Sequence, residues 1–269
     1  MRYNIIKKIK KKCIDCNTKE DKEMHLIKMN PKMFALIYGA SGSGKTHLAA
    51  TYCRLYPEDP VLLVDADLGS ATLEAKDLQD IKNLYAIEFE AFKDLNQIYE
   101  LCKKNDVDEW VKAIPELKGV LTKPFKCIIW DTWSELQWVM SSELRSKNQL
   151  SGKGLDYRPN IQLQHWGQMT DLNKLAVASF KALDIDCIFI MQSEVSQDAV
   201  TNQMIKGPAI HGKLTTELPA MFNLVIYTYN NPKGDFCATT LPKLGWPAKI
   251  RGLVGKDIVN PTMKELISE

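Results

Sequence analysis

The sequence has no long apolar run and almost no net charge. No stretch approaches the roughly 20 consecutive apolar residues that a membrane-spanning helix needs, so we expect no membrane partner. The formal net charge is +2, so any affinity for nucleic acid has to come from local patches of charge. With 45% hydrophobic and 25% charged residues among 269, the composition is that of a globular protein with a sizeable core.

The chain also has no signal-peptide pattern and no even set of cysteines. Its first residues, MRYNIIKKIKKK, are basic, and no apolar signal-peptide core follows them. Seven cysteines, an odd number, are scattered through the predicted strands and helices, which favours reduced thiols over a disulfide framework. We therefore expect a cytoplasmic protein.

Residues 1–32 are predicted to form a basic N-terminal arm that precedes the folded core. A lysine cluster is followed by Cys13 and Cys16 in a CxxC pattern, and His25 comes later. A structural zinc site needs four ligands, and the chain has no second CxxC. Zinc at Cys13 and Cys16, completed by His25 and a distant residue, stays open beside the simpler interpretation of two thiols in a lysine-rich arm.

The most specific motif follows this arm. An apolar run from Phe34 to Tyr38 leads into a glycine-rich stretch that fits G-x-x-x-x-G-K-[ST] at every fixed position, and HLAATYC then opens a helix. Glycines let successive backbone N–H groups point at a phosphate, and the helix adds the positive end of its dipole. The predicted phosphate-binding residues are Gly39, Ala40, Ser41, Gly42, Ser43, Gly44, Lys45 and Thr46. Lys45 is expected to reach the β- and γ-phosphates of ATP, and the Thr46 hydroxyl to bind Mg²⁺.

Further apolar runs predict a parallel sheet. Residues 61–64, 125–133 and 185–191 read as buried strands that alternate with amphipathic helices. Residues 221–229 and 235–240 read as two strands joined by a hairpin turn. The predicted fold class is therefore α/β, with a mostly parallel central sheet flanked by helices and a C-terminal antiparallel hairpin. The core is expected over residues 33–260, with a tail helix over 261–269.

Polar side chains follow several of these strands. Asp65 and Asp67 end the second strand, Asp131 closes the run FKCIIWDTW, and Gln192 comes just after residues 185–191. Ligands of open parallel sheets bind at the carboxyl ends of the strands. Asp131 is predicted to order Mg²⁺ together with Thr46, and Gln192 to sense the γ-phosphate.

Two polar breaks interrupt the chain, at residues 146–160 and 195–208. The first contains Lys147, Lys153 and Arg158 beside Tyr157. Cations next to an aromatic ring suit a single nucleic-acid strand, which offers phosphates to the charges and bases for stacking. The alternative is an ordinary polar loop.

The order of these motifs resembles a RecA-like P-loop ATPase. It is more specifically similar to phage-encoded nucleotide-binding proteins of the AAA-labelled recombination group, which include single-strand annealing ATPases. The phosphate loop, IIWDTWSEL and PAIHGKLTTELP with the following hairpin carry the resemblance, over about residues 33–260.

The resemblance assigns further roles. RecA-like proteins often end the second strand in D-x-E, whose glutamate activates the attacking water; Asp65-Ala66-Asp67 stands there, so Asp67 becomes the candidate base. Gln192 matches the glutamine that couples the γ-phosphate to a following DNA-binding loop, here residues 195–208, with 146–160 as the other loop. Lys249-Ile250-Arg251 is similar to a K-x-R element that hexameric relatives insert into a neighbour's ATP site.

Together these features predict an ATP-hydrolysing protein of DNA recombination or single-strand annealing. The resemblance implies single-stranded DNA as partner, a ring or filament of identical subunits, and a phage or host single-strand binding protein as a further partner; the compartment is then the host cytoplasm. The alternatives are a packaging or helicase-type motor, an ATP-gated binding protein without efficient turnover, and a small-molecule P-loop kinase. A kinase lid is expected to carry several arginines, and few follow the loop. A partition-type ATPase is disfavoured because Ala40 and Ser41 stand where it carries an extra lysine.

Overall fold

The chain divides into two units, residues 1–31 and 32–269, and the second is described here. The computed structural model describes residues 32–67, 73–89, 91–139, 163–197, 204–210, 214–242 and 245–268. Both cysteines of the CxxC, the lysine cluster and the break at 146–160 lie outside these ranges. Within the described ranges, no helix is long and apolar enough to cross a membrane.

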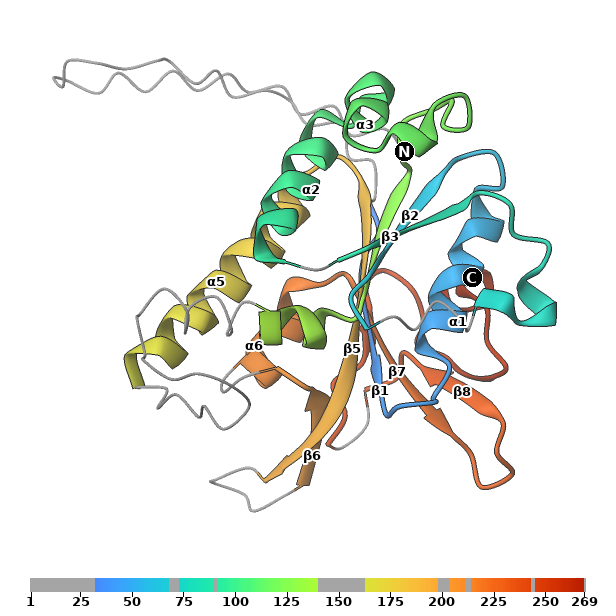
Figure 1. Ribbon diagram of the computed structural model, residues 1–269. Coiled ribbons are helices and arrows are strands. Elements are labelled where there is room, and N and C mark those ends of the chain that lie inside the picture. Colours follow the sequence, from blue (N-terminus) through green and yellow to red (C-terminus); the bar gives the residue numbers. More distant parts are fainter. Residues whose placement is uncertain are drawn as a thin grey trace, which may run out of the picture. The chain divides into compact units, whose positions relative to one another are not determined.

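A mixed sheet forms the centre of the second unit (Figure 1). Its strands follow the order β10-β8-β7-β1-β5-β4-β2-β3, with β6 on β5 and β9 on β7. The bounds are β1 Phe34–Gly39, β2 Val61–Asp65, β3 Leu84–Glu88, β4 Cys127–Asp131, β5 Asp186–Gln197, β6 Met204–Pro208, β7 Leu224–Asn230, β8 Phe236–Thr239, β9 Lys249–Ile250 and β10 Asp257–Val259.

The central strands β7, β1, β5, β4, β2 and β3 run parallel, and β8, β9 and β10 pair antiparallel beyond them. The predicted fold class, a mostly parallel α/β sheet with C-terminal antiparallel strands, is confirmed. Side chains of β1 alternate between the two faces of the sheet: Phe34, Leu36 and Tyr38 enter one core, and Ala35 and Ile37 enter the other. This is the period of two that a strand covered on both faces requires.

Helices cover both faces of the sheet, as Figure 1 shows. One face carries α2 (Phe92–Lys104), α3 (Val107–Ala113), α5 (Leu163–Ala182) and α6 (Leu214–Met221). The other face carries α1 (Lys45–Ala50), the 3₁₀ turn η1 (Thr51–Leu55) and α7 (Met263–Ile267). The short 3₁₀ turns η3 (Lys76–Leu78) and η4 (Pro115–Leu117) lie in the connections. The expected tail helix is α7, and it is fixed to η1 because the Met263 backbone N–H donates to the Thr51 hydroxyl at 2.9 Å.

Several expected elements differ from those observed. Residues 107–117 form two elements, α3 and η4, and not one continuous helix, because Pro115 cannot continue the hydrogen-bond ladder. The polar break expected at 195–208 is wrong as a plain loop: β5 extends to Gln197 and pairs antiparallel with β6 from Ser193↔Pro208 to Gln197↔Met204. Polar strands of a two-stranded ribbon carry no apolar run, so their pattern is that of a loop.

Candidate nucleotide-binding site

The phosphate loop connects β1 to α1 and depends on its glycines. Gly42 and Gly44 have φ of 71° and 80°, a left-handed backbone that side chains disfavour. Gly44 is also the N-cap of α1. A Cβ on Gly39 would collide with Thr228 of β7 and with Ser43. The sequence motif therefore fulfils the conformational and the packing requirement of a phosphate-binding loop.

Lys45 extends across this loop. Its ammonium group donates to the Ala40 carbonyl at 2.8 Å and to Gln192 Oε1 at 3.2 Å. Burial lowers the pKa of Lys45, and the nearby Asp131 and Asp67 partly offset that effect. A partly desolvated cation held over a loop of inward N–H groups is suited to bind the terminal phosphates of a nucleotide.

Asp131 and Thr46 meet at the end of β4. The Thr46 hydroxyl donates to Asp131 Oδ2 at 2.6 Å, while Asp131 Oδ1 is buried and has no hydrogen-bond partner among the described residues. An orphaned carboxylate oxygen beside a hydroxyl fits Mg²⁺, which is held by few protein oxygens together with phosphates and water. The donor set is accordingly sparse, since no group of three or more His, Cys, Asp or Glu that could hold a metal occurs within the described ranges.

Two further aspartates near Asp131 add negative charge at the carboxyl ends of β2 and β4, although the three do not form a metal-ligand group by themselves. Asp65 pairs in register with Asp131, and Asp67 follows two residues later at the wall of the cavity. The pKa of Asp131 is raised to about 6, mainly by burial and in part by Asp67 and Asp65, while the Thr46 hydrogen bond and Lys45 act in the opposite direction. The cluster is thus a region of unfavourable negative charge that a divalent cation would neutralise.

Gln192 connects the loop to the far part of β5. Its side chain accepts from Lys45, its backbone N–H donates to Ser134 Oγ at 3.0 Å, and its carbonyl accepts from Ala209 N at 2.6 Å. Residues 186–192 of β5 belong to the central sheet, whereas 193–197 pair with β6. Gln192 therefore lies where the strand passes from the core into the β5–β6 hairpin.

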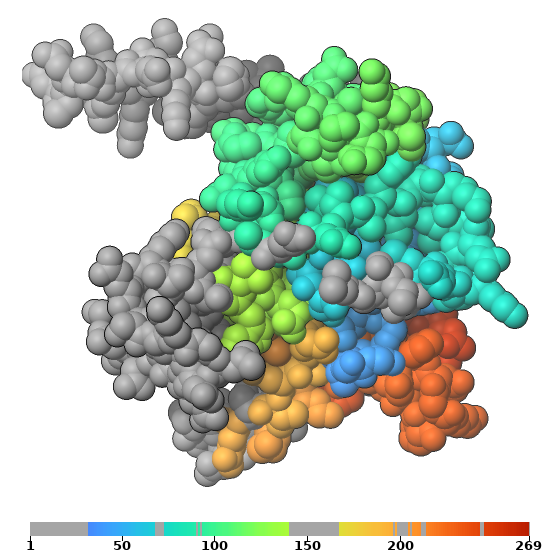
Figure 2. Space-filling view, in the orientation of Figure 1, coloured from blue at the N-terminus to red at the C-terminus, as the bar shows by residue number. Residues whose placement is uncertain are grey.

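A cavity of about 820 Å³ contains these groups. It is lined by the loop from Ser41 to Thr46 together with Asp67, Asp131, Thr132 and Gln192. It continues past the loop between two walls: His47, Leu48, Arg54, Ala75 and Asp77 on one side, and Phe236, Cys237, Asn260, Pro261 and Thr262 on the other. Figure 2 shows the surface near the phosphate loop and α1 (blue) between the teal segment of residues 73–89 and the orange-red C-terminal strands.

The structure brings together the predicted residues of the phosphate loop with Asp67, Asp131 and Gln192, but not Lys249 and Arg251. Lys249 pairs with Val225 near the beginning of β7, and its ammonium group donates to the Ala220 carbonyl. The phosphate loop follows β1, which pairs with the later part of β7 at Gly39↔Thr228. Lys249 and exposed Arg251 therefore lie near the amino ends of the parallel strands, away from this chain's own cavity.

Sequence reasoning missed the second half of the cavity. His47, Asp77, Phe236 and residues 260–262 come from four separate segments, and no spacing rule connects them. One signal was present: His47 directly follows the motif and lines the same cavity. The cysteines of the described ranges are free and buried, in agreement with the expected reduced thiols.

The fold and this site define a P-loop nucleotide-binding protein of the α/β class. A family model described as an AAA domain matches residues 31–252, and the chain belongs to that family of P-loop ATPases. No curated protein sequence matches the chain significantly. Among solved structures 110 chains match, and one is a crystal structure of the RadB recombinase, similar with a TM-score of 0.41 and 15% sequence identity over 77% of this chain and 79% of that chain.

Proposed function

We propose that this protein hydrolyses ATP in a cycle coupled to single-stranded DNA, in recombination or strand annealing. The single observation that carries the proposal is the hydrogen bond between Lys45 and Gln192. Lys45 is the side chain that reads the terminal phosphates, and Gln192 begins the part of β5 that leaves the core. A γ-phosphate bound by Lys45 competes with Gln192 for the ammonium protons of Lys45. The Lys45–Gln192 hydrogen bond therefore depends on the bound nucleotide, and this dependence links the nucleotide to the β5–β6 hairpin.

The chemistry follows from the residues at the carboxyl edge. Lys45 and the loop N–H groups neutralise charge on the β- and γ-phosphates. Asp67, which interacts electrostatically with both Lys45 and Asp131, would orient the attacking water. Thr46 and Asp131 would hold Mg²⁺, which stabilises charge on the phosphate oxygens when bound.

The β5–β6 hairpin supplies the surface for a partner. Val195 and Met204 are exposed at 56% and 60%, and Lys206, paired with Val195, lies over the Trp246 ring at 5.5 Å. Apolar side chains next to a cation and an indole suit the stacked bases and charged backbone of a single strand.

The first experiment measures ATP hydrolysis with no DNA, with single strands and with duplex. Lys45→Ala should abolish nucleotide binding, while Lys82→Ala, an exposed lysine outside the cavity lining, should not. Gln192→Ala should keep ATP affinity but lose stimulation by single strands. Turnover that ignores DNA in the wild type would contradict the coupling, and unchanged ATP binding in Lys45→Ala would contradict the site itself. DNA binding should weaken steeply with salt.

The proposal includes a ring or filament in which Arg251 completes a neighbour's site. Arg251 lies near the amino ends of the parallel strands, whereas the chain's own phosphate loop lies at their carboxyl ends. This separation supports a role in trans. Arg251→Ala should lower turnover, by roughly 10³- to 10⁵-fold for a finger of this kind, and leave ATP binding to one subunit intact. Lys233→Ala, an exposed cation in the β7–β8 turn, is the control. Equal activity of wild type and Arg251→Ala at all protein concentrations would remove the role.

A second candidate is an ATP-gated binding protein that turns over slowly. The observation that favours it is Asp67, one methylene shorter than the glutamate that RecA-like proteins carry there. ATP binding with negligible turnover, increased in Asp67→Glu, would support this candidate over the first.

A further inference from the structure

Both ends of the β5–β6 hairpin are held at its base by one hydroxyl group. The Gln192 backbone N–H donates to Ser134 Oγ at 3.0 Å, and Ser134 Oγ donates in turn to the Ala209 carbonyl at 3.1 Å. The Ala209 N–H donates back to the Gln192 carbonyl at 2.6 Å, which closes a cycle of three hydrogen bonds. Gln192 is the last residue of β5 that pairs with β1, and Ala209 directly follows β6. Ser134 therefore joins the point where the hairpin leaves the core to the point where the chain returns.

Ser134 belongs to a segment that begins at the nucleotide site. Residues 133–139 form a short helix directly after Thr132, which lines the cavity. Gln137, one turn after Ser134, is 3% exposed, and its Nε2 donates to the Ala209 carbonyl at 3.1 Å. Two side chains of this helix are thus bonded to the base of the hairpin.

The same helix carries an exposed indole. Trp138 is 59% exposed, whereas Trp110, Trp130 and Trp133 are buried. Trp133 and Leu136 attach the helix to the core on one face of the sheet. A large ring left in water is uncommon, because burying an indole is strongly favoured. The helix therefore has the nucleotide site at its beginning and an exposed aromatic surface at Trp138.

The cycle of hydrogen bonds connects this helix to the terminal phosphate. Lys45 donates to Gln192 Oε1, and a bound γ-phosphate competes for that ammonium group. A hydrogen bond weakens steeply when its distance and angle depart from their preferred values. If Gln192 shifts, either Ser134 and its helix follow, or the cycle opens. Opening is unfavourable, because Ser134 is only 8% exposed and the freed polar groups would be buried without partners.

We propose that Ser134 is a positioning residue of the nucleotide response, through which residues 133–139 and the base of the β5–β6 hairpin move together when a γ-phosphate binds. The inference rests on the proposed function and extends it, because it adds a second responding surface, at Trp138, to the hairpin. Without the Ser134 hydroxyl the two elements would respond separately.

The first test uses Trp138 as an internal reporter and needs no DNA. Acrylamide quenching of tryptophan fluorescence is measured with saturating ADP and with a saturating non-hydrolysable ATP analogue. Each protein is compared with the same protein carrying Trp138→Phe, and the difference is the contribution of Trp138. In wild type this contribution should change between the two nucleotides, and Ser134→Ala should lose most of the change. Ser134→Cys, which keeps the volume but offers only a weak donor and acceptor, should lose it too and replaces Ser134→Ala if that variant does not fold.

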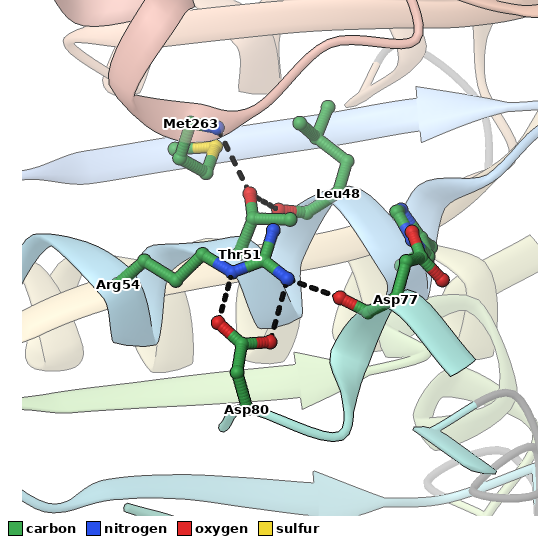
Figure 3. A network of polar contacts seen from close by, with 7 residues as sticks. Leu48, Thr51, Arg54, Asp77, Asp80 and Met263 are labelled. Carbon is green, nitrogen blue, oxygen red and sulfur yellow. Dashed lines mark hydrogen bonds and ion pairs between the residues drawn. The ribbon is translucent and has the colours of Figure 1, made fainter. Parts of the chain in front are cut away.

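Thr51→Val is the matched control, because the Thr51 hydroxyl makes the same two kinds of bond. It accepts from the Met263 N–H at 2.9 Å and donates to the Leu48 carbonyl at 2.7 Å, as Figure 3 shows. Thr51 is 1% exposed and lies outside the cavity lining. Its loss should lower the unfolding temperature, as the loss of the Ser134 hydroxyl does, and should leave the nucleotide-dependent change at Trp138 intact.

The affinity for single-stranded DNA gives a second measure. In wild type we expect the affinity to differ between the ATP analogue and ADP. Ser134→Ala should reduce the ratio of the two affinities by about 2- to 12-fold, the effect of one hydrogen bond of ordinary strength. Thr51→Val should leave this ratio unchanged.

The outcomes separate this inference from the function on which it rests. If wild type binds both nucleotides and the contribution of Trp138 is the same with each, or if the Ser134 variants keep the full change, the nucleotide site stands and the role of Ser134 is overturned. If Thr51→Val loses the change as well, Ser134 acts on stability alone, and its role is again overturned. If DNA does not bind, the DNA part of the proposed function fails, and the fluorescence measurement still decides the role of Ser134. If wild type binds neither nucleotide, both fail.

Discussion

Asp186 and Asp131 are two buried aspartates on neighbouring parallel strands. Asp186 lies at the amino ends of the parallel strands and Asp131 at their carboxyl ends, which we call the amino edge and the carboxyl edge of the sheet. Asp186 begins β5 and is fully engaged: it accepts from Met33 N at 2.8 Å and Tyr52 Oη at 2.5 Å, and pairs with Lys126 at 3.3 Å. Asp131 ends β4 with one oxygen unpartnered within the described ranges and with Asp65 and Asp67 nearby. Both side chains are buried, but only Asp186 has a partner for each of its carboxylate oxygens. The amino edge therefore stabilises the fold, whereas the carboxyl edge has an unfavourable negative charge that a bound ligand can neutralise.

Removing the satisfied aspartate should produce the largest loss of stability. Asp186→Ala leaves Lys126 and the Tyr52 hydroxyl without their acceptor, which should cost about 3 kcal/mol of unfolding free energy and lower the unfolding temperature by about 6–12 °C. Thermal denaturation measures this. Asp184→Ala, at an exposed position two residues earlier, is the matched control. Nucleotide affinity of the folded fraction should not change; a large change there would end the division between the two edges.

Removing the unsatisfied aspartate should instead affect activity. Asp131→Asn keeps the shape of the side chain but would weaken the proposed Mg²⁺ site, and we expect Mg²⁺-dependent turnover to fall by about 100-fold or more. Turnover against Mg²⁺ concentration measures the effect. Asp108→Asn, an exposed carboxylate outside the cavity lining, serves as control. Full activity of Asp131→Asn would show that the unpartnered oxygen has no ligand to bind.

A milder change at the amino edge should give an intermediate loss. Tyr52→Phe removes one hydroxyl and leaves the ring in place, so it should cost about 1.5 kcal/mol, the range for a hydrogen bond to a charged acceptor. Burial holds the pKa of Tyr52 far above its usual value, so the hydroxyl donates at all working pH values. Chemical denaturation of wild type and variant provides the number. A neutral result would mean that Lys126 and Met33 satisfy Asp186 alone.

The last expected effect has the opposite sign. Without nucleotide or Mg²⁺, Asp131→Asn should stabilise the protein at neutral pH by up to about 3 kcal/mol, since one pKa unit corresponds to about 1.4 kcal/mol. The folded-state pKa of Asp131 is raised from 3.8 to about 6, so the charged carboxylate opposes folding above pH 6. Between pH 6 and 4 the folded protein takes up the proton first, and below about pH 4 the penalty is gone. Unfolding curves in EDTA should therefore differ most above pH 6 and converge near pH 4.

The sequence predicted one of these two edges far better than the other. The glycine spacing, Lys45, Thr46 and Asp131 were found because a local motif or a strand end marks each of them. Asp186 and its partners were not, because Met33, Tyr52 and Lys126 meet only when three strands and a helix are assembled. The same holds for His47 and Phe236, which are distant in sequence and line one cavity only in the fold.

Among the secondary-structure elements, the buried strands were predictable and the short polar ones were not. β1, β2, β4 and the core part of β5 are continuous apolar runs, which indicate a parallel strand covered on both faces. β6, β9 and β10 have two to five residues each and owe their existence to pairing with a neighbour. α6 contains Pro219, which disguises it as a turn.

β5 has a mechanical consequence that its hydrogen bonds do not describe. It is one continuous strand of 12 residues. The part from Asp186 to Gln192 is fixed in the central sheet, and the residues beyond Gln192 have no neighbouring strand in that sheet. The overhanging five residues span about 17 Å at about 3.3 Å each. A tilt of about 10° at Gln192, where β5 leaves the central sheet, would move the end of the strand by about 3 Å, which is comparable with the spacing of stacked bases. The length of β5 beyond the central sheet, more than any single contact, would therefore set how far the end of the strand moves.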